Sequence, residues 1–117
     1  MSPTIAIFPG QGSQKPGMGQ DFFAESDIAR RTMEEASETL ELDMCALCFG
    51  EDPRLHLTAF TQPAILAVEI AMFRTLVRNY DLKPAYFAGH SLGEYTALVA
   101  AGVVPFVEAL RLVRLRG

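Results

Sequence analysis

A Gly-x-Ser-x-Gly pentapeptide, Gly89-His90-Ser91-Leu92-Gly93, lies between a short apolar stretch at 85–88 and a helix-like run at 94–101. This order predicts a nucleophile elbow, in which a strand turns sharply into a helix and the serine hydroxyl projects above the sheet. A Cβ at either glycine would clash in so tight a turn. The helix that begins at Leu92 would direct unpaired backbone N–H groups toward Ser91, and such donors stabilise the oxyanion of an acyl-transfer intermediate.

The order of the apolar segments predicts an α/β fold with parallel strands. Residues 4–8 form a nearly continuous apolar run, which is typical of a strand in a sheet covered on both faces. Ser26 or Asp27 is expected to cap a second helix within residues 20–40, and Pro63 is expected in the first turn of the longest helix. We expect helices over residues 20–40, 42–49, 61–80, 92–101 and 105–116, with residues 55–60 irregular. Sheets usually have about five or six strands, so the chain is expected to be the front part of a larger fold.

The 117 residues suit one domain or part of one, and half of them are hydrophobic. A net charge of −4 and the lack of a large basic cluster disfavour a nucleic-acid partner. The sequence has no run of about 18 apolar residues, so no membrane span is expected. The start of the chain lacks the basic region of a signal peptide. We therefore expect a soluble cytoplasmic domain.

Two cysteines form a Cys-x-x-Cys motif at Cys45 and Cys48. A redox motif of this kind would follow a strand directly, whereas these residues lie inside a predicted helix. A zinc site would need two more ligands, and the two histidines, His56 and His90, stand at spacings unlike those of a zinc finger. Both cysteines are expected to pack in the core, with no metal bound.

A glycine-rich loop follows the first predicted strand, at residues 8–14. The dinucleotide-binding pattern would need a glycine where Lys15 stands, and the P-loop pattern is absent. If the two strands are neighbours, this loop and Ser91 share one edge of the sheet, where open α/β folds bind ligands. The N–H of Gln11 could then be a second oxyanion donor beside that of Leu92. The alternative is a tight turn with a glutamine at its tip.

The last predicted helix carries an arginine on its apolar side. Its apolar face consists of Phe106, Ala109, Leu110 and Val113. At about 100° per residue, Arg116 falls roughly 60° from Val113, whereas Arg111, Arg114 and Glu108 fall on the other side. A guanidinium on the apolar side is costly unless it meets an anion, and arginine can bind a carboxylate through two hydrogen bonds. Otherwise the last turn frays and Arg116 extends to water.

Neither histidine is a convincing general base for Ser91. His90 is adjacent to the serine, and neighbouring side chains at a sharp turn point apart, whereas a base must come within about 3 Å of the hydroxyl. We expect His90 to stabilise the turn through a local hydrogen bond. His56 has no partner in its irregular stretch. The absence of a base supports a missing C-terminal part.

Four motifs occur in a defined order: residues 8–14 (Phe-Pro-Gly-Gln-Gly-Ser-Gln), 61–64 (Thr-Gln-Pro-Ala), 89–95 (Gly-His-Ser-Leu-Gly-Glu-Tyr) and 114–117 (Arg-Leu-Arg-Gly). Together they resemble the malonyl-CoA:acyl-carrier-protein transacylases, the acyltransferases of fatty-acid and polyketide synthesis. The resemblance covers essentially the whole chain. It implies that residues 1–117 are part of an α/β-hydrolase-like catalytic domain. It also implies that the family's ferredoxin-like subdomain, C-terminal part and base histidine are absent.

The resemblance also implies roles for single residues. Ser91 matches the nucleophile, and Gln11 and Leu92 match the residues whose amides form the oxyanion hole. Arg116 matches the arginine that pairs with the free malonyl carboxylate. Gln62 lies in a stretch that lines the same pocket, and His90 matches a histidine beside the serine that is not the base.

The implied reaction is ping-pong acyl transfer without a cofactor. Ser91 would take a malonyl group from malonyl-CoA, and the phosphopantetheine thiol of an acyl carrier protein would accept it. The chain alone is expected to be inactive. The alternatives are a serine esterase or thioesterase, an acyl-hydrolase of carrier-protein chains, and a non-catalytic piece that docks a partner chain. The sequence leaves open malonyl or methylmalonyl, the pathway and the oligomeric state.

Overall fold

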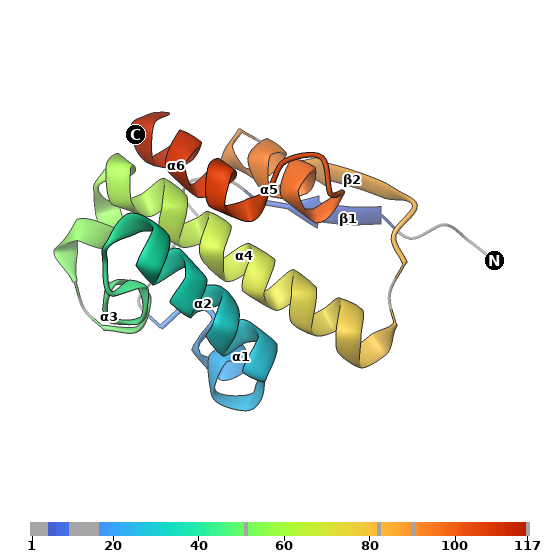
Figure 1. Ribbon diagram of the computed structural model, residues 1–117, viewed down its shortest axis with the longest axis horizontal. Helices are drawn as coiled ribbons and strands as arrows, with labels where there is room; N and C mark the ends of the chain where they lie inside the picture. The colour runs from blue at the N-terminus through green and yellow to red at the C-terminus, as the bar shows by residue number, and fades with distance from the viewer. Residues whose placement is uncertain (1–4, 10–16, 51, 82, 90, 117) are drawn as a thin grey trace.

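The computed structural model describes residues 5–9, 17–50, 52–81, 83–89 and 91–116 (Figure 1). Two strands and six α-helices are found within these residues, together with one short 3-10 helix, η1. In chain order the elements are β1 (Ile5–Phe8), α1 (Gln20–Glu25), α2 (Asp27–Leu40), α3 (Met44–Phe49), η1 (Pro53–His56), α4 (Thr58–Tyr80), β2 (Tyr86–Gly89), α5 (Leu92–Ala100) and α6 (Phe106–Arg116). This order of strands and helices confirms the predicted α/β plan.

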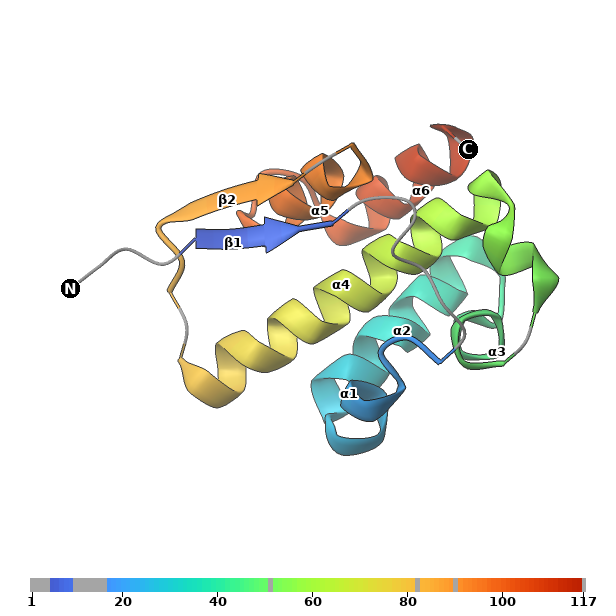
Figure 2. The same ribbon diagram turned by 180° about the vertical axis from the view of Figure 1, so that it is seen from behind.

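The two strands pair in parallel, with Ile5 opposite Tyr86 and Phe8 opposite Gly89. Parallel strands end at the same edge of a sheet, so the residues that follow β1 and β2 start next to each other. Figure 2 shows β1 and β2 side by side, with α4 beneath them. Phe73 of α4 joins the layers, since its ring centroid lies 5.7 Å from that of Phe8 and 6.0 Å from that of Phe87. The two strands are therefore neighbours in the sheet, as expected from the sequence.

Helix α4 is the central element of the fold, and α2, α5 and α6 pack around it (Figure 1). Its residues 61–68 are all buried. By length and composition alone, α4 could cross a membrane, but 61% of its most apolar 18-residue window is buried within the protein. The burial explains its composition, because a helix that is apolar on all sides is typical of a protein core.

The start of α4 differs from the prediction. The helix begins at Thr58, three residues earlier than expected, and the stretch before it forms η1 instead of irregular chain. Asp52 caps η1, since its Oδ1 accepts a hydrogen bond of 2.9 Å from the backbone N–H of Arg54. Pro63 consequently lies in the second turn of α4, inside the helix. Proline marks a first turn only by preference, and nearby contacts can override it.

The predicted cap of the second helix is confirmed at Ser26. Its Oγ accepts a hydrogen bond of 3.1 Å from the backbone N–H of Ala29. The same Oγ lies 2.8 Å from Oγ1 of Thr75 in α4, and both residues are buried. One serine therefore ends α1, begins α2 and ties α2 to the central helix.

One face of β1 is open, contrary to the prediction of a sheet covered on both faces. The exposed fractions of Ile5 and Ile7 are 55% and 74%, whereas Phe8 is buried. A groove of about 480 Å³ runs between β1 and α4, with Glu69, Phe73 and Pro84 among its lining residues. The continuous apolar run of β1 predicted two covered faces, but in the part of the chain that the structure describes no element lies over these isoleucines.

Candidate active site around Ser91

Ser91 occupies the turn between β2 and α5, as predicted. It is the N-terminal cap of α5, with φ 56° and ψ −113°, and its side chain is exposed. Few residues other than glycine adopt a positive φ, and strained conformations of this kind cost about 1–3 kcal/mol. Such strain concentrates at functional sites. His90, the preceding residue, lies outside the described residues.

The two glycines that flank Ser91 are required by the packing. A Cβ on Gly89 would overlap the carbonyl oxygen of Gly93, and a Cβ on Gly93 would overlap the carbonyl oxygen of Phe8. The expected clash at both positions is therefore confirmed. The first turn of α5 is pressed against the end of β1, and only a residue without a side chain fits there.

Leu92 is the first residue of α5, and its side chain is completely buried. The burial fixes the start of the helix, where the backbone N–H groups lack partners within the helix itself. These groups and the positive end of the helix dipole lie next to Ser91. Gln11, the other predicted donor, lies outside the described residues. Pro9, two positions before it, follows directly on the end of β1.

Glu69 of α4 is a half-buried carboxylate that the sequence patterns did not single out. Its Oε1 accepts a hydrogen bond of 2.8 Å from Oγ1 of Thr96, which joins α4 to α5. Burial raises the pKa of Glu69 to about 7, although the hydrogen bond from Thr96 lowers it. Its other oxygen, Oε2, is buried and has no hydrogen-bond partner among the described residues. A carboxylate in the middle of the apolar run 64–71 was the signal that could have revealed it.

The end of α6 lies beside the start of α4, and Figures 1 and 2 both show the C-terminus there. The predicted apolar face of α6 is confirmed, because its four residues are at most 5% exposed. Arg116 is the last residue of α6, and its side chain lies outside what the structure describes. Gln62, on the second turn of α4, is 5% exposed. The helices therefore bring the backbone of Arg116 to the same end of the molecule as Gln62.

Arg114 contacts the neighbouring helix α4, although its helical position placed it away from the apolar face of α6. Its Nη1 donates a hydrogen bond of 2.9 Å to the carbonyl oxygen of Ala59 in α4. Its guanidinium carbon lies 4.3 Å from the centroid of the Phe60 ring. A long side chain can reach back across a neighbouring helix, which an angular projection on one helix does not capture.

A protein-family model described as an acyl transferase domain matches residues 5–117. The chain belongs to the acyl transferase domain family. The match includes both strands, the turn at Ser91 and all of α6.

Relatives of this acyl transferase domain are malonyl transferases by name. The malonyl CoA-acyl carrier protein transacylase of Bacillus subtilis is 47% identical over 118 residues, covering 100% of this chain and 30% of the relative. A crystal structure of an acyl carrier protein S-malonyltransferase from Vibrio cholerae matches with a TM-score of 0.93 and 46% identity, over 98% of this chain and 38% of that one.

A third match is the structure of a type II PKS acyl-carrier protein in complex with its malonyl-transacylase. Its TM-score is 0.93 at 44% identity, over 98% of this chain and 38% of that one. The predicted fold is thus confirmed as that of malonyl transacylases. The chain spans between 30% and 38% of the length of these three proteins.

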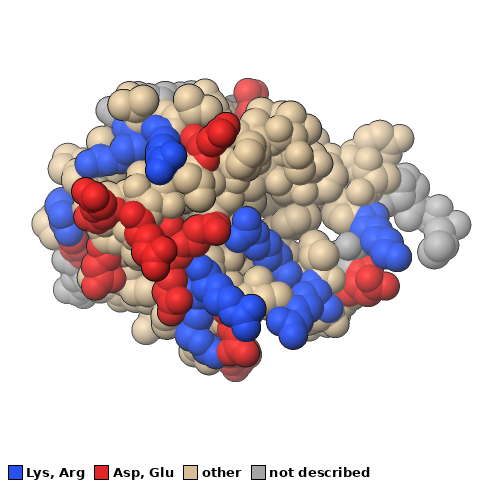
Figure 3. Space-filling view, in the orientation of Figure 1, with Lys and Arg blue, Asp and Glu red and all other residues tan. Residues whose placement is uncertain are grey.

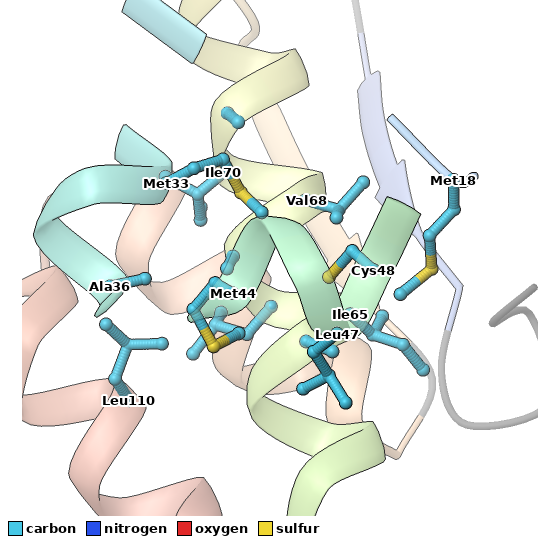
Figure 4. Packing of buried hydrophobic residues seen from close by; sticks show 14 of the residues in the cluster. Met18, Met33, Ala36, Met44, Leu47, Cys48, Ile65, Val68, Ile70 and Leu110 are labelled. Carbon is cyan, nitrogen blue, oxygen red and sulfur yellow. The ribbon is translucent and has the colours of Figure 1, made fainter. Parts of the chain in front are cut away.

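Cys48 of this acyl transferase domain belongs to the hydrophobic core, on α3 (Figure 4), and Cys45 packs against that core. Cys48 is completely buried, and burial raises the pKa of its thiol to about 12. The pKa of Cys45 is also raised, first by burial and then by Asp43 and Glu34. A thiol with a raised pKa is a poor nucleophile and metal ligand. The predicted packing role of Cys48 is confirmed by its place in the core.

Acidic and basic side chains are interspersed on the face of the domain seen in Figure 3. Arg30 forms an ion pair with Asp27. Nη1 of Arg74 lies 3.6 Å from Oε1 of Glu35.

No group of three or more metal-ligating side chains occurs among the residues that the structure describes. His56 is exposed, at the end of η1.

Proposed function

We propose that this chain supplies the nucleophile and the acyl-carboxylate-binding arginine of a malonyl-CoA:acyl-carrier-protein S-malonyltransferase. The observation that carries the proposal is the strained conformation of Ser91 at the start of α5, next to the end of β1. The names of the relatives give the acyl group and the acceptor. The turn is thus interpreted as a nucleophile elbow.

In the proposed first half-reaction, Oγ of Ser91 attacks the thioester carbonyl of malonyl-CoA. The carbon–sulfur bond breaks, CoA leaves as the thiol, and malonyl-serine remains. The serine proton passes to a base that the resemblance assigns to a histidine outside residues 1–117. The amide of Leu92, and that of Gln11 from the loop after β1, would hold the oxyanion. The burial of Leu92 supports its part, because a fixed donor needs no reorganisation during the reaction.

In the second half-reaction, the phosphopantetheine thiol of an acyl carrier protein takes the malonyl group from Ser91. The complex of a carrier protein with a malonyl-transacylase of similar fold supports this partner. No cofactor is needed, because the ester and both thioesters interconvert without redox chemistry. A cytoplasmic location stays a prediction from the sequence.

Arg116 is proposed to bind the free carboxylate of the malonyl group, with Gln62 lining the same pocket. The packing of α6 on the start of α4 supports the pairing, because it brings both backbones to one end of the molecule. An acetyl group would leave the guanidinium without its anion, so the arginine selects dicarboxylic acyl groups. His90 is proposed to brace the turn at Ser91 without acting as the base.

The proposal is tested in a chimaera in which this chain replaces the matching segment of the Bacillus subtilis relative. Arg116→Ala is expected to lower kcat/KM for malonyl-CoA by about 100-fold relative to acetyl-CoA, since a charge-assisted pair contributes about 1.5–3 kcal/mol. Arg111→Ala, which removes an exposed arginine of the same helix, is the matched control. Full malonyl selectivity in Arg116→Ala would refute the assignment of Arg116.

The alternative hydrolases are separated by the fate of the acyl-enzyme. In the chimaera, malonyl-Ser91 is expected to persist until a carrier-protein thiol is added, because transfer needs the thiol. Rapid release of free malonate without a thiol would indicate an esterase or thioesterase instead.

A further inference from the structure

Helix α4 contains a break in its hydrogen bonding that another helix repairs. Pro63 has no N–H and lies inside α4, so it cannot donate to the carbonyl four residues earlier, which belongs to Ala59. Nη1 of Arg114, from α6, donates to this same oxygen at 2.9 Å. A buried or half-buried carbonyl without a partner costs about 1–3 kcal/mol, and a charged donor forms a stronger hydrogen bond than a neutral one.

Two interactions hold the guanidinium of Arg114 against α4. The guanidinium of Arg114 donates to Ala59 and also stacks on the ring of Phe60, the next residue of α4, with 4.3 Å between the guanidinium carbon and the ring centroid. Arg54 lies on the same ring, with 5.3 Å between its guanidinium carbon and the centroid. A planar guanidinium held by a hydrogen bond and a ring has little freedom left, unlike a lysine ammonium.

The position of Arg114 gives this contact a role beyond stability. Arg114 and Arg116 stand in the last turn of α6, and the last turn of a helix frays unless it is tied down. The tie runs to Ala59, one turn before Gln62 in α4. The contact therefore joins the turn that carries Arg116 to the segment that carries Gln62.

We propose that Arg114 is a positioning residue that holds the last turn of α6 on the start of α4 and so sets the place of Arg116 for the acyl carboxylate. The inference rests on the proposed function, because Arg116 is the residue through which Arg114 acts. Pro63 creates the acceptor at Ala59, and Arg114 turns it into an anchor. The anchor therefore affects substrate specificity, since the position of Arg116 determines how well its guanidinium binds a malonyl carboxylate.

The first test measures the anchor in the chain itself, without any activity. Arg114→Met keeps a long side chain over Phe60 but removes the donors, and Arg111→Met is the matched control at an exposed position. Amide hydrogen exchange at residues 113–116 is expected to be about tenfold faster in Arg114→Met than in Arg111→Met, the loss expected for one hydrogen bond. Equal exchange rates in the two variants would overturn the anchor.

The second test measures selectivity in the chimaera. Arg114→Met is expected to raise KM for malonyl-CoA and to lower the malonyl-to-acetyl ratio of kcat/KM by about five- to tenfold, about 1–1.4 kcal/mol. A purely structural role would lower the active fraction and hence kcat for both substrates equally. Arg114→Lys is expected to recover only part of the ratio, because lysine provides a charge without the planar stacking.

The controls separate the two levels of the proposal. If Arg116→Ala loses malonyl selectivity and Arg114→Met keeps it, the positioning role is wrong and the proposed function stands. If Arg116→Ala keeps malonyl selectivity, the carboxylate-binding role of Arg116 fails and the positioning role fails with it. Loss of selectivity in both variants, but not in Arg111→Met, supports both.

Discussion

Gly93, the second residue of α5, lies against the carbonyl oxygen of Phe8, the last residue of β1. The contact couples the turn that carries Ser91 to the point where the glycine-rich loop leaves the sheet. The proposed nucleophile, Ser91, thus follows a strand that ends beside the strand preceding the proposed second oxyanion donor, Gln11, although the two residues are 80 positions apart in sequence.

Gly93→Ala is expected to lower the free energy of unfolding by about 3 kcal/mol, because its Cβ would overlap the Phe8 carbonyl and neither backbone can move freely. Gly102→Ala is the matched control. Gly102 has a φ of 80° and nothing within 4 Å of an added Cβ, so only a conformational cost of about 1 kcal/mol applies. Urea denaturation measures both. Equal losses in the two variants would show that the contact between α5 and β1 is not tight.

Ser91→Gly is expected to raise the free energy of unfolding by about 1 kcal/mol. Glycine accepts a φ of 56° without strain, and the gain exceeds the extra entropy that glycine gives the unfolded chain. Ser91→Ala keeps the Cβ and hence the strain, so it is expected to bring no such gain. Thermal or urea unfolding of the two variants in parallel measures the difference in their free energies of unfolding. A Ser91→Gly variant no more stable than Ser91→Ala would mean that the turn stores no strain.

Glu69 gives the stability of the fold a pH dependence. Its pKa in the folded chain, about 7, lies above the ordinary value of 4.5. The folded state therefore binds this proton more tightly, so the contribution to stability is full below about pH 4.5 and is lost as the pH rises to about 7. Glu69→Gln is expected to remove this loss and to be more stable than the parent by about 1 kcal/mol near pH 8, a value reduced because the side chain is only partly buried.

The hydroxyl of Thr96 influences the pH at which the stability contributed by Glu69 is lost. Its hydrogen bond lowers the pKa of Glu69, so Thr96→Val should raise that pKa further and move the loss of stability to higher pH. The measurement is urea unfolding at a series of pH values for the parent, Glu69→Gln and Thr96→Val. A parent and a Glu69→Gln variant with the same pH profile would contradict a raised pKa of Glu69 in the folded chain.

The sequence predicted the parts of the site that depend on local pattern. The turn at Ser91 follows from Gly89 and Gly93, whose missing side chains are needed within five residues of chain. The cap at Ser26 and the apolar face of α6 likewise follow from short spacings. Such features are encoded by neighbours along the chain, which is why one sequence suffices to predict them.

The sequence did not predict the contacts between helices. The pairs Glu69 with Thr96 and Arg114 with Ala59 join residues 27 and 55 positions apart. Helical periodicity gives the face on which Arg114 starts, but not the direction in which a long side chain reaches. The start of α4 was misjudged for a related reason, since Pro63 is tolerated inside the helix while Arg114 takes over its missing hydrogen bond. The loop with Gln11 and the neighbour His90 stay predictions, because they lie outside the described residues.

Peptide mapping of the acyl-enzyme determines whether Ser91 carries the acyl group. The chimaera is incubated with malonyl-CoA without carrier protein, quenched in acid, digested and analysed by mass spectrometry. One malonyl group is expected on Ser91, and none in the Ser91→Ala variant. A malonyl group on any other residue, or its retention in Ser91→Ala, would show that Ser91 is not the nucleophile.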